Sequence, residues 1–589
     1  MFAVTRVIFN SKREGFTHSL ANPVRSDIGN GTTRLTAMPF WAEAFRLGVE
    51  RPNVKDLGDS EGMLILCHNE NQLCCIESGN IVLEAKVHQQ LRAFLRQQAA
   101  ITWPHHLTMA RLVARALRLG RSALMQVGSS AVYDGNYRLS YLMSLLMWPE
   151  PAILVLPESL QQTVQLIDIP RLQQWLPSRK PVHCGDTWPH PDFQGVLLTS
   201  PKAWLSDQLD NRGIFPKGVP VVIDGSDNLE DWIRQALTVT VTASAWEALM
   251  QAYPHHRETI RDVQIQLTRQ VFQHPPNPYH CHLVDPDEQA QLQELLSGLI
   301  ASTESFAPLP SPWRQLQVAW RTPDLQLLWT VVNREQGQWR LHSAPAHVGA
   351  IAARHLWAQR PLVIIGGVLD TTAEAPLYRQ RLGLADLTCL KFGPDRQAES
   401  IQLYLPDRLP PPNSAQFQAL VNHELVHLLI TPAAQQGPVV VLVGDLPLKG
   451  QIGATLAAQF GSRVQVESTT LSEQGILVSG WQFWQAHQRA LPRPRLLIIV
   501  TLPIPSLEDP TVAGRVSAYK RNRQDWFRLY LLPTALNALQ QAIAPVRRNQ
   551  GTVVLLDSRV NSRSYGREIL DALSPFARLH HLESDWIEV

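Results

Sequence analysis

Two glycines bound a polar loop of the kind that could hold phosphate. Gly128 follows an apolar run at residues 123–127, and a second apolar run, at residues 152–156, lies beyond Gly135. Phosphate loops occur between such a strand and a helix, where backbone N–H groups hold phosphate, lysine neutralises charge and a hydroxyl binds magnesium. Here Asn136 and Tyr137 stand where lysine and hydroxyl would be. The sequence predicts the architecture of a nucleotide site without its usual chemistry.

A second motif has the letters of a zinc peptidase. His423, Glu424 and His427 spell HExxH within a predicted helix at residues 414–429, which would place both histidines on one face beside a general base. A zinc site needs a third ligand, and none follows at a familiar spacing; the next acid, Asp445, ends a predicted strand. The pattern favours an ordinary helix surface over a metal site, with the zinc peptidase as a remote alternative.

A third group of residues interleaves cations with aromatic rings. Its members are Lys520, Arg521, Arg523, Trp526, Phe527, Arg528 and Tyr530. Such a composition suits phosphate contact and base stacking along a single strand of nucleic acid. A solvated helix whose Trp and Phe face the core explains the same letters, and a charge run does not decide between the two.

Composition limits the class of protein. The 589 residues carry 53 Lys and Arg against 51 Asp and Glu, so no strong overall field attracts nucleic acid or an anionic membrane. The six cysteines are scattered without a CxxC pair, as expected in a reducing compartment. Without a leader or a long apolar stretch, we expect a cytoplasmic protein that makes no membrane contact.

Strands alternate with helices through most of the chain. After a weakly ordered N-terminal extension at residues 1–82, apolar runs at 123–127, 152–156, 195–199 and 219–224 are separated by helical patterns. This alternation predicts an α/β lobe with a doubly wound parallel sheet, whose ligands bind beyond the carboxyl ends of the strands. The first lobe should cover residues 83–240 and resume at 316–400 with a strand pair, LQLLWTVV and GQWRLHSA, before PLVIIGG.

Two further parts complete the expected architecture. Residues 241–315 read as a helical insertion within the first lobe, because helical periodicity is broken there only by Pro-rich segments. A Pro-rich hinge at 405–413 opens a second α/β lobe, residues 401–589, with strands at 439–443, 464–467, 475–478, 496–501 and 552–557. The result is two similar lobes facing a cleft.

Several segments, in one order, resemble motifs of the DinG/XPD-type superfamily 2 DNA helicases. LLIIVTLPIPSLEDPTVAGRVSAYK and WFRLYLLPTALNALQQAIAPVRRNQGTVVLLDSRVNSRSYGREIL are similar to the family's C-terminal lobe. In the first lobe, PHHLTMARLVARAL resembles the adenine-sensing segment, ILVLPESLQQ the first DNA-contacting motif, VVIDGSDNLED the strand ending in the DEAH box and IIGGVLD the Ser-Ala-Thr segment. GWQFWQAH resembles the Phe-Trp-Glu-Gly motif. The likeness covers roughly residues 83–589 and implies two RecA-like lobes.

The resemblance also implies site residues. ATP and magnesium would lie between the lobes, near His106 at the family's adenine-reading glutamine, Gly128, Gly135, Asn136, Tyr137 and Gln541, where the final arginine-bearing motif begins. The DEAH acids reduce to Asp224 followed by Gly225, Ser226 and Asp227. Gln485 and Ala486 follow Phe483 and Trp484, and Pro545 replaces the first arginine so that Arg548 alone stays in register. Cys184 stands alone, so no iron–sulfur cluster is expected.

These substitutions predict hydrolysis at background level. An arginine finger alone is worth about 10³ to 10⁵ in rate, and the loop lysine and the DEAH glutamate are replaced as well. Asp224 and Arg548 are the catalytic candidates that remain, and ATP binding without turnover stays open. We expect a helicase-family protein that binds single-stranded DNA or RNA through Lys520, Arg521, Arg523, Trp526 and Arg528; the alternative is a structural or adaptor protein on the same fold.

Overall fold

The computed structural model describes residues 82–579 except 99–100, 102, 302–307, 321–325, 358–360 and 407–408, and leaves out the side chains of 432–433. The predicted N-terminal extension, residues 1–82, lies outside the described residues apart from Val82. Leu83–Val589 is one compact unit. None of its described helices combines the length and hydrophobicity needed to cross a bilayer.

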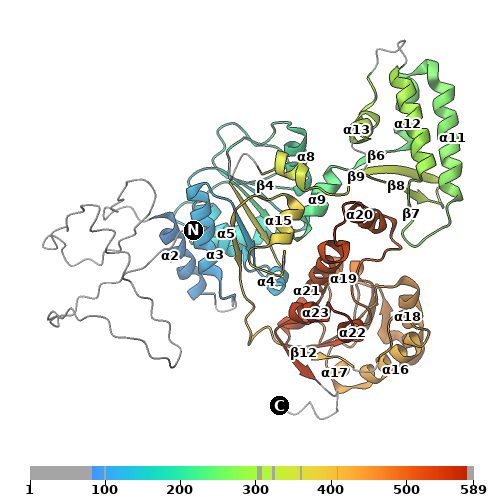
Figure 1. Cartoon of the computed structure of the whole chain (residues 1–589). Helices are drawn as coiled ribbons and strands as arrows, with labels where there is room; N and C mark the ends of the chain where they lie inside the picture. Colours follow the sequence, from blue (N-terminus) through green and yellow to red (C-terminus); the bar gives the residue numbers. More distant parts are fainter. Residues whose placement is uncertain are drawn as a thin grey trace, which may run out of the picture. The chain divides into compact units, whose positions relative to one another are not determined.

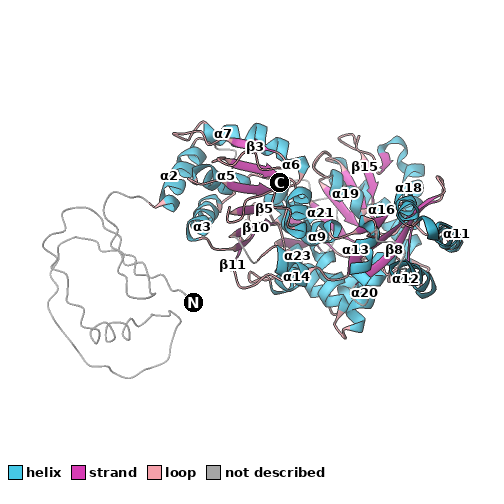
Figure 2. Cartoon of the chain, turned by 90° about the horizontal axis from the view of Figure 1, so that it is seen from above, coloured by secondary structure: helices cyan, strands magenta, loops and turns pink. Residues whose placement is uncertain are grey.

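The first lobe is built on a seven-stranded parallel sheet (Figures 1 and 2). Its order is β11 (Thr388–Lys391), β1 (Ala123–Gln126), β10 (Leu362–Gly366), β5 (Val221–Asp224), β2 (Ala152–Val155), β4 (Val196–Thr199) and β3 (Val182–Cys184). The central strands are buried along their whole length. Continuous apolar runs are typical of parallel strands covered on both faces, and the predicted doubly wound sheet is confirmed.

Alternate residues of each strand serve two separate cores. Met125 and Leu154 pack with α2 (Leu83–Arg96), α3 (His106–Leu119) and α5 (Arg138–Met147) on one face. Leu124 and Ile153 face the other way, toward α8 (Pro201–Asp210), α9 (Leu229–Ala236), α14 (Gly349–His355) and α15 (Pro376–Leu382). The period of two in side-chain direction thus fixes both helical layers.

The second lobe repeats this plan. Its seven-stranded parallel sheet has the order β14 (Val464–Val466), β15 (Ile476–Ser479), β13 (Val439–Leu442), β16 (Leu496–Ile499), β17 (Thr552–Leu555), β12 (Ile401–Tyr404) and β18 (Phe576–Leu579). One face packs against α16 (Phe417–Ile430) and α18 (Leu446–Phe460), and the other against α19 (Trp481–His487), α21 (Leu532–Arg548) and α23 (Gly566–Leu573). Two RecA-like lobes are therefore present, as predicted.

The insertion contains a sheet of its own, which corrects the expected boundaries. The strand pair assigned to the first lobe, β8 (Gln326–Asn333) and β9 (Gln338–Pro345), joins β6 (Val239–Val241) and β7 (Cys281–Leu283) in a four-stranded antiparallel sheet. Helices α10 (Ala243–Ala252), α11 (Arg257–Gln273), α12 (Pro286–Ala301) and α13 (Ser311–Trp320) cover it. In the second half of β8, from Thr330 to Asn333, buried and exposed residues alternate, as expected where one face of a sheet is solvated. The insertion is therefore mixed α/β and spans β6 to β9.

Helix α20 (Pro510–Arg521) of the second lobe packs on the insertion sheet (Figure 1). A Cβ built on Gly514 would lie 2.0 Å from Leu327 Cδ1 and 3.1 Å from Leu283 Cδ2. The helix therefore approaches β7 and β8 at a distance that only glycine permits. This contact joins the insertion to the second lobe.

Trp484, from the segment that resembles the Phe-Trp-Glu-Gly motif, is a core residue. It is fully buried, and its indole N–H donates to the Ala542 carbonyl of α21 at 3.1 Å. Phe483 beside it is only partly buried and stacks on His487, with 4.3 Å between ring centroids. The tryptophan thus ties α19 to α21, the helix that ends at Arg548.

Replacing this tryptophan should loosen the second lobe. We expect Trp484→Ala to lower the free energy of unfolding by about 3–5 kcal/mol, because a large ring leaves a cavity and a buried carbonyl loses its donor. Urea denaturation of the full chain measures the loss. Trp481→Ala, at a half-buried position of the same helix, is the matched control and should cost less; equal losses would contradict the assignment.

Candidate functional site

The loop after β1 is folded into a short helix. α4 (Ser129–Asp134) begins immediately after Gly128, and Gly135 ends it with its N–H on the Ala131 carbonyl. The two glycines have φ of 88° and 77°, values that other residues adopt only with strain. Both predicted glycines are therefore needed for the backbone, but the residues between them form a helix instead of an open phosphate cradle.

Asp224, at the end of β5, is enclosed by hydroxyl groups. Tyr137 donates to its Oδ1, Tyr141 donates to Oδ2 at 2.8 Å, and the Gly225 N–H donates to Oδ1 at 2.8 Å. All three side chains are at most 1% exposed. Burial, and then the Asp224 carboxylate, raises the pKa of both tyrosines well above its ordinary value, so both stay protonated donors.

Magnesium does not fit this arrangement. A magnesium ion is usually held by one or two carboxylates together with waters and substrate phosphates, and it demands an octahedral shell of oxygens. Both oxygens of Asp224 are already bonded to protein donors. Tyr137, at the position of the metal-binding hydroxyl, is turned onto the acid itself. The residues present therefore do not form the magnesium site that the fold family implies.

Arg138 occupies space beside the phosphate-loop position. It is 6% exposed, its Nε lies 3.3 Å from Asp168 Oδ2, and its Nη1 has no hydrogen-bond partner among the described residues. A Cβ on Gly135 would lie 2.2 Å from Arg138 Nη2. Burial lowers the pKa of Arg138, but the opposite effect of its neighbours, led by Tyr137 and Tyr141, is larger. The pKa is therefore raised overall, and the guanidinium stays charged. The Arg138 guanidinium is thus a fixed cation near the position where the loop lysine would act. It was not identified from the sequence.

His106 lies inside the first lobe. It is 2% exposed, and its Nδ1 is 2.8 Å from the Ser140 hydroxyl on α5. Trp103 covers it edge-on, with 5.1 Å between ring centroids. Burial lowers the pKa of His106 to about 4, so the ring is neutral near pH 7. In this position the imidazole links α3 to α5, and its Nε2 is buried without a hydrogen-bond partner among the described residues.

Asp227, the second acid after β5, holds the loop after β10. Its carboxylate accepts from the Gly367 N–H at 2.8 Å and the Val368 N–H at 3.1 Å. A Cβ on Gly366 would lie 3.0 Å from Asp227 Oδ2 and 2.4 Å from Leu369 Cδ2. The acid is therefore bonded within the first lobe and is not placed to orient an attacking water.

The two lobes meet at α4 through an ion pair. Arg548, the arginine that stays in register with the family's final motif, has its Nε 2.7 Å from Asp134 Oδ2. The side chains are 25% and 12% exposed. Burial raises the pKa of Asp134, and Arg548 opposes that rise. A carboxylate of the first lobe thus takes the arginine that the resemblance assigns to nucleotide phosphate.

Two more arginines of the second lobe contact α4. Arg489 Nη2 donates to the Val132 carbonyl at 2.8 Å, and Arg493 lies 5.7 Å from the centre of the Tyr133 ring. Between the lobes is a cavity of about 610 Å³, lined by Tyr133, Asp134, Asn136, Arg489, Leu491, Pro492, Arg493 and Arg548. The cleft is therefore positively charged, and Asn136 is among the residues that line it.

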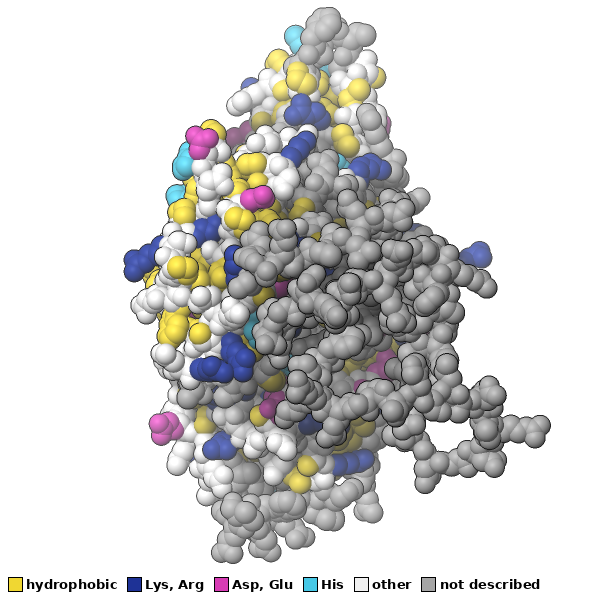
Figure 3. Space-filling view, turned by 90° about the vertical axis from the view of Figure 1, so that its left-hand side faces the viewer, with side chains coloured by type: hydrophobic (Ala, Val, Ile, Leu, Met, Phe, Trp, Pro, Cys, Tyr) yellow, Lys and Arg dark blue, Asp and Glu magenta, His cyan; other side chains and the backbone are white. Residues whose placement is uncertain are grey.

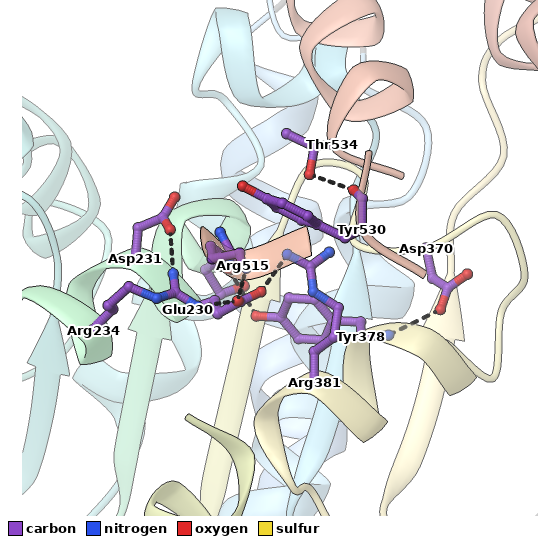
Figure 4. Close-up of polar contacts among 10 residues, drawn as sticks. Glu230, Asp231, Arg234, Asp370, Tyr378, Arg381, Arg515, Tyr530 and Thr534 are labelled. Carbon is purple, nitrogen blue, oxygen red and sulfur yellow. Dashed lines mark hydrogen bonds and ion pairs between the residues drawn. The ribbon is translucent and has the colours of Figure 1, made fainter. Parts of the chain in front are cut away.

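A second contact between the lobes centres on Glu230 of α9 (Figure 4). Arg381 and Arg234 of the first lobe and Arg515 of α20 all pair with this carboxylate, Arg234 and Arg515 at 2.5 Å. Burial raises the pKa of Glu230, but Arg381, Arg515 and Arg234 outweigh it and hold the pKa well below its ordinary value. Arg515 also lies 3.9 Å from the centre of the Tyr530 ring. The cluster fixes α20 against the first lobe.

The predicted nucleic-acid residues lie around the end of α20. Lys520, Arg521, Arg523 and Arg528 are exposed, whereas Trp526 is half-buried, with Lys520 Nζ 5.4 Å from its ring centre. Tyr530 is buried and stacks on Tyr519. Solvated cations and core aromatics are thus both present. On the face drawn in Figure 3, Lys and Arg side chains are scattered among other types.

Gln541 and the HExxH motif lie away from these contacts. Gln541 donates to Asn537 one turn earlier in α21, at 3.0 Å. His423 and His427 are exposed on α16 with 4.6 Å between ring centroids, and Glu424 accepts from the Tyr404 hydroxyl at 3.4 Å. Among the described residues, no third ligand joins the two histidines.

Sequence reasoning missed the residues that hold these contacts. They are Asp134, Arg138, Tyr141, Glu230 and Arg515. Asp134 and Arg138 immediately flank the named loop positions, so charge near the loop was a usable signal. The partners Arg548 and Asp224 are distant in sequence, and no spacing rule connects them.

Comparisons with known proteins agree with this fold. A family model described as a helicase C-terminal domain matches residues 460–576. Over 255 residues the chain is 23% identical to the 3'-5' exonuclease DinG of Bacillus subtilis, covering 40% of the chain and 27% of the relative. Over 260 residues it is 23% identical to the ATP-dependent DNA helicase YoaA of Haemophilus influenzae, covering 42% and 40%. The chain thus spans less than half the length of either relative.

A solved structure of XPD helicase shares the fold. It superposes with a TM-score of 0.53 and 12% sequence identity, covering 80% of this chain and 99% of the other. Residues 460–576 thus match a helicase C-terminal domain, and the two parallel sheets make the chain similar in fold to XPD helicase and similar in sequence to the DinG and YoaA relatives.

Proposed function

We propose that this chain binds single-stranded nucleic acid as a helicase-family protein that does not hydrolyse ATP. The observation that carries the proposal is the enclosure of Asp224 by Tyr137 and Tyr141. In a P-loop nucleotide site the acid at this position helps to hold magnesium. A carboxylate that is buried and bonded to two protein hydroxyls and a backbone N–H is unavailable for that task.

The arginine of the final motif supports the same proposal. Arginine stabilisation of the transferring phosphoryl group is worth about 10³ to 10⁵ in rate. Arg548 is paired with Asp134, and Pro545 occupies the other arginine position. Catalysis of phosphoryl transfer is mostly positioning and electrostatics, so losing the metal ligand and the free arginine together leaves background hydrolysis.

Built-in ion pairs replace nucleotide as the agent that closes the lobes. In a motor of this fold, nucleotide between the lobes would draw them together and release them after hydrolysis. Here Asp134 supplies the anion for Arg548, and Glu230 supplies a second for Arg515. The cleft keeps Arg489 and Arg493 on its wall, so magnesium-free phosphate could still be attracted, but closure does not depend on it.

Nucleic-acid binding is proposed from the similarity to helicases and from exposed charge. One relative is an ATP-dependent DNA helicase and the other a 3'-5' exonuclease. In this chain Lys520, Arg521, Arg523 and Arg528 offer exposed cations beside Trp526. The strand could be DNA or RNA. A structural or adaptor role is the alternative, favoured by the same ion pairs, since a protein with locked lobes can serve as a scaffold.

Hydrolysis separates the proposed protein from a motor. We expect ATP turnover, with and without single-stranded DNA, to equal that of Asp224→Asn and Arg548→Ala, because neither group is free for catalysis. A steady-state phosphate-release assay measures it. DNA-stimulated turnover that either substitution abolishes would contradict the proposal.

Strand binding separates the proposed function from the adaptor alternative. We expect the affinity for a single-stranded oligonucleotide to fall as the salt concentration rises. The logarithm of the binding constant should fall with the logarithm of the salt concentration, with a slope of about −0.7 for each phosphate contact. The triple substitution of Lys520, Arg523 and Arg528 by Ala should weaken binding and flatten the slope, as measured by fluorescence anisotropy. Arg212→Ala, on an exposed arginine of the first lobe, is the control for charge. Absence of binding by the unmodified chain favours the adaptor.

The Asp134–Arg548 pair should couple the lobes without nucleotide. A double-mutant cycle with Asp134→Asn and Arg548→Gln should give a coupling free energy of about 1–3 kcal/mol, as expected of a contacting pair that is largely buried. The exposed pair of Asp210 and Arg212, with side chains 52% and 54% exposed, should give less than about 1 kcal/mol. Urea unfolding measures both cycles, and similar values for the two pairs would contradict the assignment.

A further inference from the structure

A cluster of metal-binding side chains lies at one corner of the insertion, away from the helicase motifs. His274 follows α11, Asp285 precedes α12, and Glu288 is in the first turn of α12. One ligand atom from each residue lies within 4.8 Å of the others. The segment from the end of α11 into the first turn of α12, HPPNPYHCHLVDPDE, contains all three.

The distances are close to those of a coordination shell. His274 Nε2 is 3.2 Å from Glu288 Oε1 and 3.9 Å from Asp285 Oδ2. A metal held tetrahedrally about 2.0–2.2 Å from nitrogen and oxygen ligands separates those ligands by roughly 3.3–3.6 Å. The three donors therefore need only small side-chain shifts to share one ion.

A helix cap explains only part of this geometry. Glu288 Oε2 accepts from the Asp285 N–H at 2.9 Å, which is the reciprocal half of a capping box. Its other oxygen is hydrogen-bonded to His274 Nε2 at 3.2 Å instead of to a backbone group. The Asp285 carboxylate is 62% exposed, and no described hydrogen bond uses its side-chain oxygens for the cap. Asp285 thus adds a ligand that the cap does not require.

The surroundings orient His274. Arg334 donates to the carbonyl groups of Phe272 and His274 and so holds the chain at the end of α11. His282 of β7 stacks on His274, with 4.8 Å between ring centroids and 15° between planes. Two carboxylates, those of Asp285 and the buried Glu288, lie beside the imidazole of His274. A bound metal cation would neutralise their negative charge.

We propose that His274, Asp285 and Glu288 bind one divalent transition-metal ion. One imidazole nitrogen and two carboxylate oxygens, with room for water, are ligands of the zinc class. The ion would join the end of α11 to the start of α12 beside β7. Because β7 packs against α20 of the second lobe, its role is to stiffen the corner through which the insertion contacts that lobe.

The test uses the full chain stripped of metal with a chelator. Zinc added back should bind and raise the melting temperature, and cobalt should give the visible absorption of a low-symmetry site. Asp285→Asn should weaken the site at least about tenfold, since even groups that only orient a metal ligand change affinity by about 10- to 100-fold. The variant keeps the backbone N–H that Glu288 caps, so its fold is preserved.

Matched variants decide where a bound ion lies. His274→Ala should also remove the ion, whereas His423→Ala, in the HExxH segment of α16, should retain it with unchanged affinity. Metal binding by the unmodified chain that equals binding by Asp285→Asn overturns the proposal. Absence of saturable binding overturns it as well, and loss in His423→Ala alone moves the site to α16.

Discussion

Every other feature of the cleft depends on a buried carboxylate that must have partners. Asp224 ends the central strand β5 with no exposed surface, and an unpaired buried charge costs several kcal/mol. A metal ion would meet that need in a working site; here two tyrosine hydroxyls and a backbone N–H meet it. Tyr137 follows the short helix α4, whose last residue, Asp134, pairs with Arg548 of the second lobe.

The contacts between the lobes differ in how acid would affect them. Burial dominates at Asp134 and raises its pKa, whereas three arginines depress that of Glu230. As pH falls, Asp134 therefore gains its proton first, and the α4 contact weakens while the Glu230 cluster persists. The contact at α20 is therefore the less sensitive of the two to acid, and the contact at α4 is the more sensitive.

Sequence patterns predicted the lobes well and the insertion less well, for a physical reason. A parallel strand buried on both faces is a continuous apolar run, so β1, β2, β5 and β16 could be read directly. A strand pair such as β8 and β9 does not reveal which sheet it joins. At the site, the spacing of Gly128 and Gly135 was enough to identify them from the sequence. The contacts of Tyr137 with Asp224 and of Arg548 with Asp134 join residues far apart in the chain, so no local pattern predicts them.

The point of departure of the insertion has a mechanical consequence. The chain leaves the first lobe after β5 and α9 and returns through α14 to β10, and β5 and β10 lie side by side in the sheet. Their carboxyl ends carry Asp224 and the loop that Asp227 holds. A displacement of the insertion would therefore act on the first lobe through α9 and α14, next to the two strands that end at Asp224 and Gly366.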